Sequence, residues 1–143
     1  MPEQSYSNHA QRVPLFIAGG LILLLSLIGA VVIFIHSFER PAQHHVAMLL
    51  IAISVASLFG LVQNRQSALK AQDRAIRAEE NLRHFAMTGK LLDKRLTTRQ
   101  IIAVRFASDD QFVELAKQAA DQGMKPDDIK KAVKTWRPDF HRA

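Results

Sequence analysis

The sequence contains no cysteine among its 143 residues. Disulfide bonds, thiolate zinc sites and cysteine nucleophiles are therefore excluded. The sequence also lacks an H-E-x-x-H zinc motif, a glycine-rich nucleotide fingerprint and a recognisable Ser–His–Asp arrangement. We accordingly predict a protein that is not an enzyme, with no catalytic residue, no metal ligand and no cofactor.

Charged residues are absent from two long apolar stretches, Leu15–Ile35 and Val46–Val62. A helix of about 20 apolar residues spans the hydrocarbon core of a bilayer. A soluble core of this size could not hide two helices that are apolar on every side. The first stretch is too long for a signal peptide and is followed by no cleavage site, so it reads as an anchor. The sequence predicts a transmembrane hairpin over residues 15–62, preceded by a tail over residues 1–14.

Glycine and proline are absent from residues 63–88, which are rich in strong helix formers. We expect the second span to continue into a helical arm over these residues, ended by Gly89. Small and apolar side chains recur along this arm with heptad spacing, a pattern that we call the seam. The seam consists of Leu61, Ala68, Ala75 and Leu82, with Ala71, Ala78 and Phe85 between them. Two interpretations remain open: a coiled coil, or one amphipathic helix that rests on its own C-terminal module.

The net charge of +6 lies entirely in residues 63–143. Four basic residues follow the second span closely, whereas the loop between the spans carries only Arg40. Because basic residues near the ends of spans stay in the cytoplasm, both termini are expected there. The four residues are expected to lie near anionic lipid headgroups. They are Arg65, Lys70, Arg74 and Arg77.

The second span carries a ridge of small residues at spacing four, Ala52, Ala56 and Gly60. Such a ridge lets two helix backbones approach closely in lipid. It is predicted to serve helix packing, either within the hairpin or between two copies in a homodimer.

The C-terminal module, residues 89–143, is predicted to contain three helices, over residues 98–107, 109–122 and 126–137. Capping-box patterns, Pro126 and Gly123 mark their ends. The two capping boxes are Thr97 with Gln100 and Ser108 with Gln111. Trp136 is expected on the core face of the last helix, beside Ile129 and Val133. Because the core is small, we expect Leu82 and Phe85 of the arm to complete it.

One acidic cluster and one group of histidines could suggest metal sites, but a structural role is favoured for both. Asp109, Asp110 and Glu114 begin a helix, where carboxylates stabilise the helix dipole. They offer too few converging oxygens for a hard cation. Three histidines flank the loop, with no thiolate and no carboxylate partner beyond Glu39: His36, His44 and His45. We therefore predict that they are interfacial polar residues.

Residues 109–137 also match a helix-turn-helix pattern. Lys130, Lys134 and Arg137 would then share one exposed face of the last helix and form a possible partner surface. Base contacts come from the start of a recognition helix, and this helix starts with Asp127 and Asp128. The charge layout therefore argues against nucleic acid as the partner.

Three segments of the arm and the module carry a resemblance to a known family. They are RHF-x-x-TGK from Arg83, LD-x-RLT-x-RQIIA-x-RFASD from Leu92 and IKKA-x-K-x-WR-x-D from Ile129. Together with the two apolar stretches, they resemble an uncharacterised family of small bacterial two-span membrane proteins. The resemblance covers nearly the whole chain and implies a location in the bacterial plasma membrane. Because no activity is assigned to that family, it implies no functional residue.

The expected fold is all-α: a transmembrane helical hairpin, a long cytoplasmic helical arm and a small C-terminal helical module. The expected function is that of a non-enzymatic, membrane-anchored interaction protein. Its expected partners are the lipid bilayer and an unknown protein, with a second copy of the chain as a further candidate. The alternatives are a membrane-tethered nucleic-acid-binding protein and an accessory subunit of a larger membrane complex.

Overall fold

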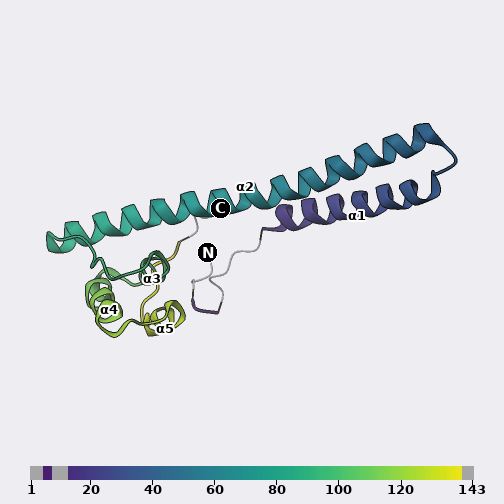
Figure 1. Cartoon of the computed structure of the whole chain (residues 1–143). Helices are drawn as coiled ribbons and strands as arrows, with labels where there is room; N and C mark the ends of the chain where they lie inside the picture. The colour runs from purple at the N-terminus through teal and green to yellow at the C-terminus, as the bar shows by residue number, and fades with distance from the viewer. Residues whose placement is uncertain (1–4, 8–12, 140–143) are drawn as a thin grey trace. The chain divides into compact units, whose positions relative to one another are not determined.

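A computed structural model describes residues 5–7 and 13–139 of the chain. These residues form five α-helices and no sheet, which confirms the all-α class (Figure 1). The helices are α1 (Pro14–His36), α2 (Pro41–Thr88), α3 (Thr98–Val104), α4 (Asp109–Gln122) and α5 (Pro126–Ala132). The chain divides into two compact units, Arg12–Ser67 and a second that contains Ala68–Ala143. Helix α2 runs without a break through the boundary between them, as predicted for the arm.

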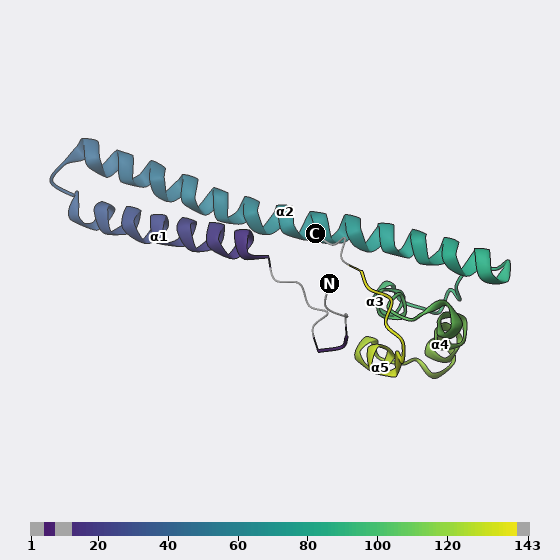
Figure 2. The ribbon, with the colours of Figure 1, turned by 180° about the vertical axis from the view of Figure 1, so that it is seen from behind.

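In the first unit, α1 and the beginning of α2 lie antiparallel and side by side (Figures 1 and 2). Both helices are long and apolar enough to cross a membrane, judged by length and composition. The two apolar stretches leave residues 36–45 between them, but the connection consists only of residues 37–40, because Pro41 already begins α2. His44 fastens the turn: its ring stacks on Phe34 with centroids 4.2 Å apart and lies 3.3 Å from Ser37 Oγ. This histidine therefore has a packing role in the hairpin.

In the hairpin, the buried residues of α1 and α2 have small side chains. Ala30 and Ala47 are 3% and 0% exposed, and Ser54 is buried as well. Further along, Leu61 Cδ2 lies 3.8 Å from the position that a Cβ atom on Gly20 would take. Because Ala47, Ser54 and Leu61 recur every seven residues, one face of α2 runs along α1.

The predicted ridge of small residues lies outside this contact. Ala52 and Ala56 are exposed, and no atom lies within 4 Å of the position of a Cβ on Gly60. The ridge therefore does not pack within the hairpin in the structure, because α1 lies against the neighbouring face of α2. Packing against a second copy stays a prediction.

In the second unit, the expected signals set several helix ends. Thr97 and Gln100 form the predicted capping box at the start of α3. Pro126 lies in the first turn of α5. Gly89 and Gly123 follow α2 and α4 with φ of 72° and 59°, the left-handed conformation that glycine adopts without strain.

Helices α3 and α5 are shorter than predicted. Residues 105–108 and 135–137 pair instead of extending the helices: Arg137 N donates to Phe106 O at 2.7 Å, and Ser108 N donates to Thr135 O at 3.1 Å. The predicted capping box of Ser108 and Gln111 does not form. The Gln111 side chain instead donates to Ala132 O at 2.7 Å and accepts from Lys134 N at 2.9 Å. These backbone groups are thereby satisfied without another helical turn.

The core of the module is built from all three of its helices and from the segments that connect and follow them. Phe106, Phe112 and Ile129 are its largest fully buried side chains. Trp136 packs against this core, 4.8 Å from the ring of Phe106, but from an extended segment and not from the predicted helix face.

Leu82 and Phe85 do not complete the core of the module. They are 68% and 51% exposed, contrary to the prediction. Helix α2 turns a different face toward the module, and that face carries the candidate site.

Candidate functional site

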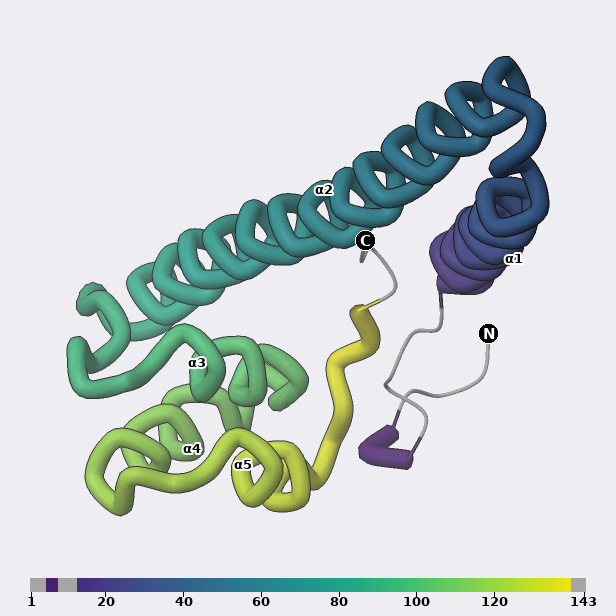
Figure 3. The backbone as a smooth tube through the Cα atoms, turned by 45° about the vertical axis from the view of Figure 1, so that its right-hand side comes forward, coloured from purple at the N-terminus to yellow at the C-terminus, as the bar shows by residue number. Residues whose placement is uncertain are grey.

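Helix α2 meets the C-terminal module along a face that contains Ile76, Glu80 and Arg83. Ile76 and Glu80 are buried, and the side chain of Arg83 is 11% exposed. Spacings of four and three place these residues on one side of a helix. Figure 3 shows α3, α4 and α5 beside this part of α2.

Arg83 makes most of the polar contacts across this junction. Its Nε donates to Asp109 Oδ1 at 2.9 Å, and Nη2 donates to the same oxygen. Nη2 also donates to Ala107 O at 2.8 Å, and Nη1 donates to Glu80 Oε2 at 3.1 Å. The planar guanidinium thus joins α2 to the end of α3 and the start of α4, a geometry that the fork of an arginine suits.

The environment of Arg83 favours a cation on several grounds. Its guanidinium carbon lies 4.1 Å from the centre of the Phe112 ring, a cation–π contact. The carbonyls that it contacts, those of Arg105 and Ala107, follow the C-terminal end of α3, where positive charge is stabilised. Asp109, at the first position of α4, has a pKa lowered below its usual range by the hydrogen bond and charge of Arg83.

Glu80 is the buried carboxylate of the cluster, 6% exposed. Its Oε2 accepts from Arg83, and its Oε1 lies 3.8 Å from Arg137 Nη1. Loss of hydration raises the pKa of Glu80 above its usual value of 4.5, although the hydrogen bond and charge of Arg83, Arg137 and Arg105 act in the opposite direction.

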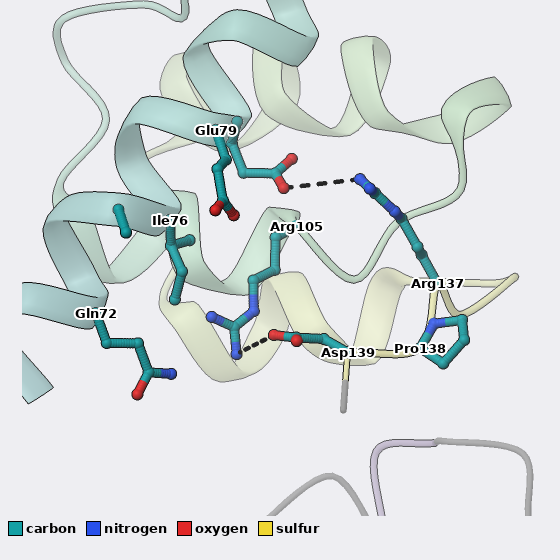
Figure 4. A pocket seen from close by; sticks show the side chains of 9 residues that line it. Gln72, Ile76, Glu79, Arg105, Arg137, Pro138 and Asp139 are labelled. Atoms are coloured by element: carbon teal, nitrogen blue, oxygen red, sulfur yellow. Dashed lines mark ion pairs between the residues drawn. The ribbon is translucent and has the colours of Figure 1, made fainter. Parts of the chain in front are cut away.

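A cavity of about 460 Å³ lies beside this cluster (Figure 4). Arg105, which is 6% exposed, enters it from the end of α3, and its Nη2 lies 3.2 Å from Asp139 Oδ2. The guanidinium carbon of Arg105 stands 4.7 Å from the ring centre of Phe106. Figure 4 shows Arg105, Arg137, Asp139 and Glu79 around the space.

Two further hydrogen bonds hold the loop that follows α2. Leu92 N donates to Asn81 Oδ1 at 3.2 Å, and the ring Nδ1 of His84 donates to Lys90 O at 2.6 Å. His84 also lies edge-on to Phe112, with centroids 6.1 Å apart. The chain thereby turns back from α2 into the module along a defined path.

The chemistry available here is that of a clamp. Each arginine of the cluster faces a carboxylate. The charges therefore balance, and the cluster offers no excess of positive or negative charge to bind a charged ligand. Among residues 5–7 and 13–139, no three His, Asp or Glu side chains are grouped as for a metal ion. We name the cluster the Arg83 clamp; it comprises Glu80, Arg83, Arg105, Asp109, Arg137 and Asp139.

The residues predicted for a partner surface do not share a helix face. Lys130 lies on α5, 3.8 Å from Asp127. Lys134 and Arg137 lie beyond the end of α5, because that helix ends at Ala132. Both residues are exposed, and Arg137 also faces Glu80 in the clamp.

The predicted membrane-surface residues all lie on α2. Lys70, Arg74 and Arg77 are exposed and, at spacings of four and three, share one face of the helix. Arg65 is half-buried, and its position along the helix places it on a different face.

The clamp itself was not predicted from the sequence. Glu80, Arg83 and Arg105 carried no expected role, and Asp109 was expected only to favour the helix dipole. One signal was available: Arg105 stands between Val104 and Phe106 in an apolar stretch, where a charge needs a buried partner. A second was that Arg83, Arg105, Asp109, Arg137 and Asp139 all belong to the segments that carry the family resemblance.

The first prediction concerns the fork of Arg83. In the full-length protein in detergent, Arg83→Lys keeps the charge but loses the several directed hydrogen bonds, so it should lower the free energy of unfolding by about 2–3 kcal/mol. Thermal unfolding followed by the fluorescence of Trp136, the only tryptophan, measures this. Arg99→Lys, at an exposed position, is the matched control. A change in Arg83→Lys no larger than in Arg99→Lys would contradict the clamp.

The second prediction concerns Glu80 and pH. Because its folded pKa is raised above 4.5, the stability that Glu80 contributes is present below that pH and is lost as pH rises through the folded pKa. Asp109 acts only near and below its usual 3.8, outside this window. Between pH 4.5 and 7, the wild type should therefore lose stability relative to Glu80→Gln.

The measurement is the melting temperature against pH for both proteins. Glu79→Gln, which removes a carboxylate at an exposed neighbouring position, is the matched control. Parallel curves for the wild type and Glu80→Gln would show that burial does not perturb this carboxylate.

Comparison with known proteins adds one match. Residues 1–143 match the model of a family described as "Family of unknown function (DUF6526)". No curated protein and no solved structure matches the chain significantly. The extent of the family match agrees with the resemblance to an uncharacterised family over nearly the whole chain.

Proposed function

We propose a function for this chain, which belongs to the family of unknown function DUF6526, from the properties of its two units. The protein is a non-enzymatic, membrane-anchored interaction protein of the bacterial plasma membrane. Helix α1 and the apolar part of α2 form a two-span hairpin. The arm and the C-terminal module remain in the cytoplasm, where they meet the lipid surface and a protein partner.

The observation that carries this proposal is the apolar surface of the hairpin. In the most apolar 18-residue stretches of α1 and α2, only 6% and 11% of the stretch is buried. Large side chains such as Leu15, Leu25 and Phe59 are 84%, 67% and 68% exposed. In water, contiguous apolar surface on this scale would drive association, whereas in lipid it lies in its preferred solvent. The helices also satisfy their own backbone groups, as a bilayer requires.

The basic residues of α2 support the cytoplasmic orientation. Lys70, Arg74 and Arg77 form an exposed basic face just beyond the apolar part of the helix, and Arg40 is the only basic residue in residues 37–40. The distribution follows the positive-inside rule. The same face suits anionic headgroups, each basic residue contributing about 1 kcal/mol near such a surface.

The clamp supports an interaction role over catalysis, because its charges already pair with one another. The nucleic-acid alternative has less support. Helix α5 is only 7 residues long, and its first turn presents Asp127 and Asp128. A recognition helix reads bases from its first turn, where these carboxylates would repel phosphates.

The third prediction tests anchoring and orientation together. Because the chain has no cysteine, Glu39→Cys and Lys134→Cys each introduce a unique thiol at an exposed position. In intact bacterial cells from which the outer membrane has been removed, a membrane-impermeant maleimide should label Glu39→Cys. It should label Lys134→Cys only after permeabilisation.

The reverse labelling pattern would overturn the orientation. Release of the wild-type protein from membranes by alkaline carbonate would overturn anchoring itself. The two results are independent, so each part of the proposal can fail separately.

A further inference from the structure

The module leaves the seam of α2 uncovered. In the second unit, the seam consists of Ala68, Ala71, Ala75, Ala78, Leu82 and Phe85, and all six are exposed. The larger two, Leu82 and Phe85, are 68% and 51% exposed. The structure thus excludes one of the two interpretations of the heptad pattern, because the seam is not the face that rests on the module.

The module and the seam occupy different sides of α2. With Ala75 and Leu82 at heptad position a, the module-facing residues Ile76 and Arg83 fall at position b and Glu80 at position f. Positions b and f lie on the outside of a coiled coil, away from a and d. A second helix could therefore pack along the seam while the Arg83 clamp stays intact.

Charges beside the seam complement a second copy of the same helix. Arg74 is at position g and Glu79 is at position e of the next heptad, five residues later. In a parallel two-stranded coiled coil, these are the positions that pair between chains. Both residues are exposed, and among the described residues neither forms an ion pair.

Within one helix, Arg74 and Glu79 cannot pair with each other, because five residues place them on opposite sides of the seam. In a symmetric dimer, the arrangement would make two equivalent Arg74–Glu79 pairs. The charge pattern therefore matches another copy of this chain in parallel register.

We propose that the seam is a homodimer interface, in which two copies of α2 pack in parallel along residues 68–85. The inference rests on the proposed membrane anchoring, since two copies inserted with the same orientation must present their arms in parallel. Anchoring also raises the effective concentration of the arms, which a seam of three short, mostly alanine repeats needs. Alanine at a and d lets the backbones approach closely, and Leu82 and Phe85 add apolar area toward the end of the arm.

Single-cysteine crosslinking of the full-length protein in native membranes tests the interface. Ala71→Cys, Ala75→Cys and Ala78→Cys place a unique thiol at seam positions d, a and d. Arg77→Cys is the control, because this exposed residue is at position c, off the seam. Under mild oxidation, the seam variants should form dimers at least about tenfold faster than Arg77→Cys, since disulfide formation requires the Cβ atoms to come close.

Charge reversal then tests the pairing and its register. In the Ala78→Cys background, Arg74→Glu opposes like charges across the interface and should slow dimer formation about threefold. Adding Glu79→Arg restores opposite charges and should return the rate. Recovery in the double variant would not follow if Arg74 served only the lipid surface.

The outcomes separate this inference from the proposed function. If the protein fractionates with membranes but all four cysteine variants crosslink at the same rate, the interface is wrong and anchoring stands. No recovery in the double variant overturns the parallel pairing. Seam thiols that crosslink only to a different protein give the seam another occupant and overturn the homodimer. Absence of the wild type from the membrane fraction overturns the proposed function itself.

Discussion

The guanidinium of Arg83 is the group on which the arrangement of the second unit depends. A cation with a side chain 11% exposed is stable only when its hydrogen bonds and charge are matched, and here Glu80, Asp109 and the Ala107 carbonyl match them. The contacts are directional, so they set both the face of α2 that meets the module and the position along it. Phe112 provides the apolar side of the same site.

The division of α2 into faces follows from this placement. The clamp holds the module at Ile76, Glu80 and Arg83, so the apolar side chains of Leu82 and Phe85 are left outside. A more apolar junction would have packed the module against the seam and buried Leu82 and Phe85. The polar clamp therefore allows one helix to hold its own module and still present an apolar stripe, which gives the proposed dimer its surface.

Periodicity and end signals predicted most of the fold. The two apolar stretches, the unbroken arm and the positions of Gly89 and Gly123 all follow from local rules that act within a few residues. The predicted ends of α3 and α5 were wrong. The true ends depend on pairing between residues 105–108 and 135–137, which are distant in sequence. Gln111 was misassigned for the same reason: its amide reaches Ala132 and Lys134, and no local pattern reveals that.

The clamp could not be predicted from spacing, because its charges come from α2, the end of α3, the start of α4 and the C-terminal segment. Such long-range pairing depends on tertiary structure. The sequence hinted at it only through the unusual setting of Arg105 and the family segments that contain most of the clamp residues. The seam shows the converse limit. Its heptad pattern was visible in the sequence, but only the position of the module indicated which interpretation the fold leaves open.

The central claim is that the end of α2 and the C-terminal module are one cooperative unit held by Arg83. Native-state hydrogen exchange of the full-length protein in detergent tests it most directly, because amides of one unit open together with one free energy. The account predicts that amides of α2 around Glu80 and Arg83 exchange with the same opening free energy as those of α4. Exchange at the end of α2 as fast as in a fraying helix, while α4 stays protected, would contradict it.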